Sequence, residues 1–214
     1  MTVRINKDAL NLREELTKAQ GVVRYEQRQF WMDGLVENGT FDTADGWALG
    51  AGWSVSGGAL SHASGTAGSS RHPVDLVLGK RYKAVAEVTS WTGGTGNIQF
   101  SNGGTTTATI IDSVGSFEVY YTAEGNNLVG FYSASTGVFS IGDIAVFEVD
   151  ENDNVIHSVP LGFKPVHVYE DGLLQREGEN HDYTVVNSGA GYQIKPTVAP
   201  SATTETCVIA EREL

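Results

Sequence analysis

The pattern of apolar and polar positions divides the chain into three segments. In residues 1–33 the apolar residues recur at alternating spacings of four and three, the period of an amphipathic helix. In residues 34–150 short runs alternate apolar and polar positions between glycine-rich turns, which is the period of β-strands. Residues 151–214 hold further strand-like runs with a more acidic composition. The sequence therefore predicts a mainly β fold: an N-terminal helix, an antiparallel β-sandwich and a small C-terminal β domain.

The first segment predicts a helix over residues 5–30 with an N-cap at Asn6 and a heptad seam. The seam consists of Ile5, Ala9, Leu12, Leu16, Ala19, Val23 and Phe30. Gly21 weakens the helix interior by about 1 kcal/mol and marks a candidate kink. Two interpretations stay open: the helix packs on its own domain, or its seam is shared between protomers or docked on another protein. The second is favoured, with a homotrimer as the expected assembly.

The middle segment predicts an antiparallel sandwich or barrel. Its clearest runs are "RYKAVAEVTSW" (81–91), "GSFEVYYTA" (115–123) and "GVFSIGDIAVFEVD" (137–150). Period-two alternation places Tyr82, Ala84, Ala86 and Val88 on one face of a strand, and Phe117, Val119 and Tyr121 on one face of another. Turn signals recur about every eight to twelve residues, which is typical of all-β domains. Phe41 and Trp47, at the start of this segment, are predicted core anchors.

The third segment predicts a small β domain that leans on a neighbour for stability. Asp171-Gly172 is a hairpin turn signal between two strand-like runs, and Pro196 and Pro200 bracket a loop. Its strand-bearing part, residues 158–214, has a marginal size for an independent hydrophobic core.

The charge of the chain limits its partners. Twenty-six acidic residues against fourteen Lys and Arg leave a net charge of −12. Such a chain repels phosphate backbones, so nucleic-acid binding is not expected, whereas docking on a basic protein surface is compatible. No apolar run approaches the roughly 18–20 residues of a membrane span, so no membrane insertion is expected. The N-terminus lacks an apolar signal-peptide core, and the single cysteine, Cys207, is interpreted as a small buried hydrophobe.

Catalytic patterns are missing from the sequence. The histidines are His62, His72, His157, His167 and His181. None of them is spaced as an HxH or HExxH metal pair, and no GxSxG or P-loop motif occurs. The glycine-rich stretches 93–97 and 102–107 join strands to strands, so they do not predict a phosphate site at a helix N-terminus. The sequence therefore predicts a protein that is not an enzyme.

The middle segment resembles the carbohydrate-binding modules of families four, nine, sixteen and twenty-two, which have a galactose-binding-like jelly-roll fold. The matching stretches are "ENGTFDTADGW" (37–47), "WSVSGGAL" (53–60), "GKRYKAVAEV" (79–88), "GSFEVYYTA" (115–123) and "GVFSIGDIAVFEV" (137–149). The resemblance covers about half the chain and implies the fold of residues 34–150. Many such sandwiches have no known ligand, so sugar binding does not follow from the fold alone.

The same resemblance implies two kinds of site. Members often carry a structural calcium, for which Asp42, Asp143 and the Thr40 carbonyl are the matching candidates; the alternative is two solvated acids at strand ends. No other cofactor is expected. Members also stack sugar rings on aromatic side chains, and Trp91, Tyr121 and Tyr132 are the candidates here, unless they pack in the core or at its rim. In each of the pairs "YY" (120–121) and "FY" (131–132), one ring points inward and the other outward.

Two shorter stretches resemble bacteriophage virion proteins. "VYEDGLLQREGENHDYTVV" (168–186), with its following strand, proline-containing loop and closing strand, resembles small β-domains of tail fibres. "INKDALNLREELTKA" (5–19) resembles the start of short phage virion proteins. In many fibres the similar β-domain is N-terminal and attaches to the tail, whereas here it is C-terminal, which leaves open which end faces the particle.

Together these observations predict a non-enzymatic phage virion structural protein, assembled in the host cytoplasm. A tail fibre or tail-attached adaptor that assembles through residues 1–33 is the first choice, with other copies of the chain and other virion proteins as partners. The alternatives are a capsid fibre or decoration protein, and a glycan-binding module that contacts host surface polysaccharide. A structural module of a bacterial surface protein is disfavoured by the missing signal-peptide core.

Overall fold

A computed structural model describes residues 27–31, 34–102, 106–125, 127–159, 161–187, 191–198 and 206–212. This part of the chain is mainly β, and all of its sheets are antiparallel, as the sequence predicts. It contains no helix that is long and apolar enough to cross a membrane. The helix predicted over residues 5–30 lies outside the described residues as far as residue 26, with the seam positions Ile5, Ala9, Leu12, Leu16, Ala19 and Val23.

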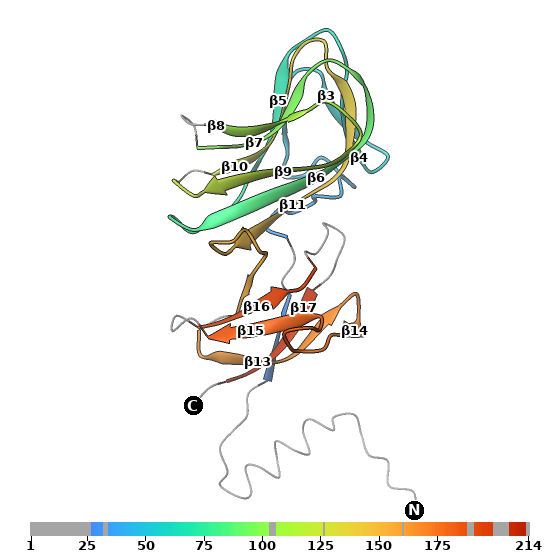
Figure 1. Cartoon of the computed structure of the whole chain (residues 1–214). Coiled ribbons are helices and arrows are strands. Elements are labelled where there is room, and N and C mark those ends of the chain that lie inside the picture. Colours follow the sequence, from blue (N-terminus) through green and yellow to red (C-terminus); the bar gives the residue numbers. More distant parts are fainter. Residues whose placement is uncertain are drawn as a thin grey trace, which may run out of the picture.

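Two five-stranded sheets form a sandwich (Figure 1). The distal sheet has the order β2 (Ala48–Leu49), β5 (Gly68–Pro73), β10 (Leu128–Ser133), β7 (Gly96–Ser101), β8 (Thr106–Ile111). The proximal sheet has the order β3 (Trp53–Ser56), β4 (Ala59–His62), β11 (Val138–Val149), β6 (Arg81–Gly93), β9 (Gly115–Thr122). The sheets are called proximal and distal by their distance from the C-terminal unit, which lies next to the proximal sheet (Figure 1).

The sandwich core is built from the alternating residues that the sequence indicates. Tyr82, Ala84, Ala86 and Val88 of β6 all point inward and are at most 2% exposed. Phe41 and Trp47 are buried as predicted, with their ring centroids 5.1 Å apart. Phe131 and Trp53 complete this aromatic cluster, with centroids 6.1 Å apart. Burial of each such side chain contributes about 2–3 kcal/mol, so this cluster is a main source of the sandwich's stability.

The C-terminal unit consists of two smaller sheets that enclose a second hydrophobic cluster. The first has the order β1 (Gln27–Trp31), β17 (Thr206–Arg212), β13 (Phe163–Glu170), β14 (Leu173–Leu174), and the second the order β12 (His157–Ser158), β16 (Tyr192–Pro196), β15 (Tyr183–Asn187). Val168, Ile194 and Val208 are buried between them. Asp171 and Gly172 have φ of 48° and 77°, so they form the predicted tight hairpin turn between β13 and β14.

The strand β1 corrects the prediction that the N-terminal helix continues to residue 30. Its five residues pair antiparallel with β17, with Gln27 opposite Glu211 and Phe30, a predicted seam position, opposite Val208. A short sequence of mixed aromatic and polar residues fits both the helical and the strand period, and pairing with a distant strand decides which structure forms. Residues 27–31, which precede the sandwich in the chain, therefore belong to the same sheet as β17, the last described strand of the chain.

The two units are joined by a hydrogen-bonded turn. The Ile156 N–H donates to the Glu148 carbonyl at 2.9 Å, and Val149 and Val155 form an antiparallel bridge. β11 thus turns back on itself before it continues into β12. On the outer face of β11, Phe147 packs with Val149 and Val155, and its ring lies 6.4 Å from that of His157 in the C-terminal unit. The junction therefore has its own apolar contacts in addition to the covalent connection.

Candidate functional site

The outer face of the distal sheet is the candidate binding surface, and we call it the distal face. Figure 1 shows the distal sheet on the side of the sandwich remote from the C-terminal unit. The outer face of the proximal sheet, by contrast, is partly covered at Ala145, Phe147 and Val149 by the junction. The distal face therefore offers a partner or ligand its exposed positions, among them Tyr132 and Arg71, although Gln99 and Gly130 between them are buried.

The register of the strands determines which side chains meet on the distal face. Ile98, Phe100, Val129 and Phe131 point into the core, so the residues that alternate with them point outward. One outward row across the sheet is Ser69, Tyr132, Asn97 and Ile110; the next is Arg71, Gly130, Gln99 and Ala108. These rows combine one aromatic ring, two amides and one guanidinium.

Tyr132 is the one predicted glycan-binding residue that the structure places on this face. It is 37% exposed, whereas its neighbour Phe131 is fully buried, so the "FY" pair divides inward and outward as the alternation predicts. Gln99, in the next row, is 6% exposed, so most of its side chain is covered. The Asn97 Oδ1 is without a partner in the described part of the chain. The feature of this face that is open to a polyhydroxylated ligand is thus the Tyr132 ring, on which a sugar can stack, whereas the two amides are largely covered.

The other two predicted glycan-binding residues lie elsewhere. Tyr121 is 4% exposed and stacks on Phe100 in the core, with ring centroids 5.0 Å apart, so its faces are not available to a sugar. The outward ring of the "YY" pair is that of Tyr120. Trp91 is half-buried against the sandwich core, and its Nε1 is buried, which favours the alternative that it packs at the rim of the core. Both residues therefore stabilise the sandwich.

The fold brings the loop that holds two of the candidate calcium ligands, Thr40 and Asp42, to the strand that holds the third, Asp143. Thr40 donates from Oγ1 to the Asp42 carboxylate at 3.0 Å, and the Gly39 carbonyl accepts from the Ile144 N–H at 2.9 Å. The loop of Thr40 and Asp42 thus lies against β11 next to Asp143. Burial, and then the nearby Glu87 carboxylate, raise the pKa of Asp143. The described residues contain no cluster of three or more His, Cys, Asp or Glu arranged to hold a metal, so the calcium site stays a prediction.

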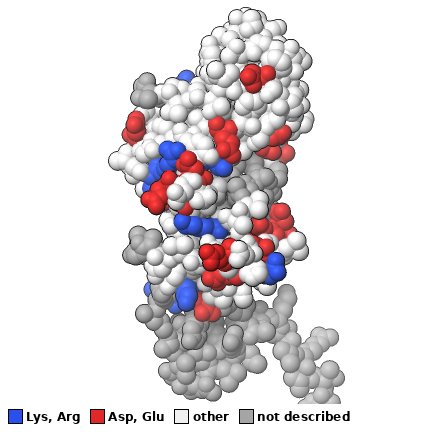
Figure 2. Space-filling view, in the orientation of Figure 1, with Lys and Arg blue, Asp and Glu red and all other residues white. Residues whose placement is uncertain are grey.

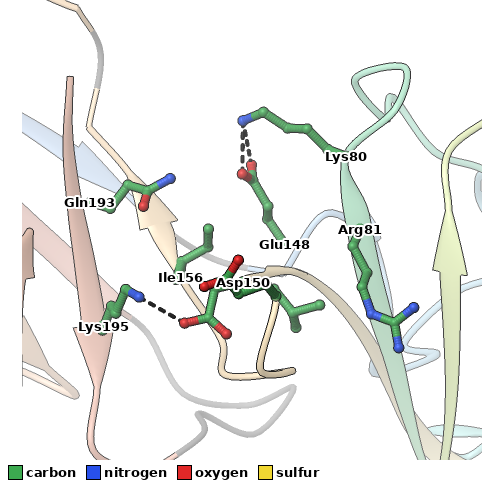
Figure 3. Close-up of a pocket in the computed structure, with 9 residues that line it drawn as sticks. Lys80, Arg81, Glu148, Asp150, Ile156, Gln193 and Lys195 are labelled. Carbon is green, nitrogen blue, oxygen red and sulfur yellow. Dashed lines mark hydrogen bonds and ion pairs between the residues drawn. The ribbon is translucent and has the colours of Figure 1, made fainter. Parts of the chain in front are cut away.

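A cleft of about 560 Å³ lies between the two units (Figure 3). It is lined by Lys80, Arg81, Glu148, Val149, Asp150, Glu151, Ile156, Gln193 and Lys195. Lys80 pairs with Glu148 at 2.8 Å, and Lys195 of the C-terminal unit pairs with Asp150 at 2.7 Å. These lining cations already have carboxylate partners within the protein, so the cleft is best understood as a charged part of the junction.

Sequence reasoning identified Tyr132 but missed Arg71, Asn97 and Gln99. The signal for the two amides was present, because in "GNIQFS" they alternate with Ile98 and Phe100. Arg71 had no comparable signal, since it becomes a neighbour of Gln99 only through the pairing of β10 with both β5 and β7. Comparison with known proteins adds no assignment: no protein-family model matches the chain, and no curated protein matches its sequence.

Proposed function

We propose that the chain is a non-enzymatic virion structural protein, a tail fibre or tail-attached adaptor component. The observation that carries this proposal is the pairing of β1 with β17, which sets Gln27 opposite Glu211. The first and the last described strands of the chain therefore lie side by side in the C-terminal unit. The sandwich lies at the other end of the molecule (Figure 1). This is the arrangement of a module that is anchored at one end and projects its sandwich outward.

The arrangement also suggests an answer to which end faces the particle. Residues 1–26, whose sequence resembles the start of short virion proteins, connect directly to β1 in the C-terminal unit. The tail-fibre-like stretch 168–186 belongs to the same unit. In this proposal both attachment elements act together at the C-terminal unit, and the jelly-roll-like sandwich faces away from the particle.

Mass spectrometry and antibody labelling of purified particles test this proposal. For the phage that encodes the chain, we expect the protein in intact particles and gold-labelled antibodies against it at the tail. Label on the capsid surface would instead identify a capsid fibre or decoration protein. Absence from purified particles, with the protein found free in the lysate, would refute the proposal.

Native mass measurement tests assembly through the N-terminal seam. We expect a homotrimer for the full chain and a shift towards monomer for the double substitution Leu12→Asp and Leu16→Asp. The substitution Lys7→Asp, off the seam, is the matched control and leaves the oligomer unchanged. A monomeric full chain at micromolar concentration would contradict the seam as an assembly element.

Glycan binding by the distal face is a second candidate function, favoured by the exposed Tyr132 ring beside the Gln99 and Asn97 amides. Stacking on an aromatic ring and hydrogen bonds to amides are how proteins hold neutral sugar rings. Glycan-array screening followed by calorimetric titration tests it. We expect Tyr132→Ala to weaken binding at least tenfold and Tyr132→Phe to weaken it less, because the ring face remains. Leu78→Ala, an exposed apolar position off the face, is the control. Absence of binding to any glycan would refute this function.

A further inference from the structure

The distal sheet differs from the rest of the protein in its charge. Its five strands contain no Asp or Glu, and Arg71 is their only Lys or Arg. The proximal sheet, in contrast, carries Glu87, Glu118, Asp143 and Glu148. Figure 2 shows the charged residues in that view gathered mainly at the lower edge of the sandwich and over the C-terminal unit. In a chain with a net charge of −12, the five strands of the distal sheet thus contribute no carboxylate.

Arg71 is also the exception among the four cations of the sandwich. The other three face carboxylates: Lys80–Glu148 at 2.8 Å, Arg81–Asp153 at 2.6 Å and Lys83–Glu118 at 3.1 Å. Arg71 is exposed and forms no ion pair with any described residue. A guanidinium presents a planar set of N–H donors that fits a carboxylate with two parallel hydrogen bonds. Arg71 therefore keeps this capacity available for a group from outside the chain.

The Arg71 guanidinium lies on the same face of the sheet as the Tyr132 ring and the Gln99 amide. Gly130 lies between Arg71 and Gln99 in the same row, where a Cβ would collide with the Ser70 carbonyl oxygen of β5, so only glycine fits there. Two strand spacings separate Arg71 from Gln99, which is about 10 Å between their backbones. Tyr132 lies in the adjacent row, two residues from Gly130. A saccharide unit on this face would meet the two exposed side chains, the Tyr132 ring and the Arg71 guanidinium, together.

We propose that the distal face binds saccharides that carry a carboxylate, and that Arg71 is the residue that selects them. This inference rests on the glycan-binding function and specifies its ligand class. Arg71 holds the carboxylate, and Tyr132 stacks on the sugar ring. Because the strands of the distal sheet supply no acid, a carboxylate beside Arg71 meets no like charge from them. The ligand class covers both uronic acid units and sialic acid units.

Calorimetric titration of the full chain with matched saccharide pairs tests the selection. The probes are trigalacturonate with neutral galactotriose, and sialyllactose with lactose; the two pairs distinguish a uronate from a sialate ligand. We expect the acidic member of at least one pair to bind ten- to a hundredfold more tightly, as charge-assisted hydrogen bonds to a carboxylate provide. Arg71→Gln removes this preference, because the acidic member then binds no more tightly than the neutral one, and Arg71→Lys keeps only part of the preference.

The outcomes separate this inference from the function on which it rests. Equal affinity for acidic and neutral members, lost in Tyr132→Ala, overturns carboxylate selection and leaves glycan binding in place. An acidic preference that persists in Arg71→Gln overturns the assignment of Arg71. No binding of any of the four probes, with no binding on a glycan array, refutes glycan binding itself. Arg81→Gln, a cation already paired with Asp153, is the control and changes neither affinity. An unchanged thermal unfolding midpoint of Arg71→Gln verifies that its fold is intact.

Discussion

We expect acid to weaken the contact between the sandwich and the C-terminal unit through His157. This residue is 6% exposed, its ring packs edge-on against Phe147, and its Nε2 is buried without a hydrogen-bond partner in the described part of the chain. Burial lowers the pKa of His157 from its ordinary value of 6.5 to about 4. The folded protein therefore holds the imidazole neutral over a range of pH in which the unfolded chain protonates it.

The size of the effect follows from these two pKa values. Because the folded-state pKa is the lower one, the contribution of His157 to stability is complete above pH 6.5 and is lost as the pH falls towards 4. Between pH 7 and about pH 4.5, the unfolded state gains about 2 kcal/mol relative to the folded state from this one group. A loss of this size is a large fraction of a typical free energy of unfolding.

Urea unfolding at a series of pH values from about 7.5 to 4.5 checks this prediction. We expect the wild type to lose about 2 kcal/mol more than His157→Gln over this range, since glutamine does not titrate. His167→Gln, at an exposed position, is the matched control and follows the wild type. His62 and His72 are present in all three chains, so their contributions cancel in the comparison. Parallel pH profiles for wild type and His157→Gln would refute the reasoning.

Two further predictions concern the backbone approach at β11 and the ion pair at the junction. Gly39→Ala places a Cβ 2.1 Å from the Ile144 carbonyl oxygen, so we expect urea unfolding to show a destabilisation of about 1–3 kcal/mol. Gly142→Ala is the control and should destabilise the protein less, because its Cβ meets a side-chain methyl group. Equal effects of the two substitutions would contradict this prediction. At Asp150, burial raises the pKa, but hydrogen bonds from Lys195 and from the following turn outweigh it and lower the pKa from 3.8 to about 2. The folded-state pKa is again the lower one, so this stabilisation is complete above pH 4 and is lost towards pH 2. Asp150→Asn should therefore cost about 1 kcal/mol at pH 7, and a cost that persists undiminished at about pH 2.5 would contradict this.

Much of the sandwich was predictable because its strands are buried on one face. The alternation of Tyr82, Ala84, Ala86 and Val88 matches the pleat of β6, and all four point into the core. The turn at Asp171-Gly172 was likewise predictable, since it needs two residues that accept positive φ. Local pattern and local backbone chemistry suffice for such features, whichever strands become neighbours.

The aromatic pairs mark the limit of local pattern. Alternation requires one ring of each pair to point inward, but it does not say which one. In the structure Phe131 and Tyr121 are the inward rings, because Phe131 packs beside Trp47 and Trp53 and Tyr121 stacks on Phe100. Two of the three predicted glycan-binding aromatics therefore belong to the core or its rim, and only Tyr132 remains on an open face.

By itself, the sequence determined the β class of the protein, the positions of many core residues and the acidic character of the chain, because periodicity and composition depend on each residue and its close neighbours. Only the tertiary structure decided that residues 27–31 form a strand of the C-terminal sheet, and that Arg71, Gln99 and Tyr132 share one face of the sandwich. These relations depend on the register between strands that are far apart in the chain. Register is set by how whole sheets pack, and that information is spread over the core.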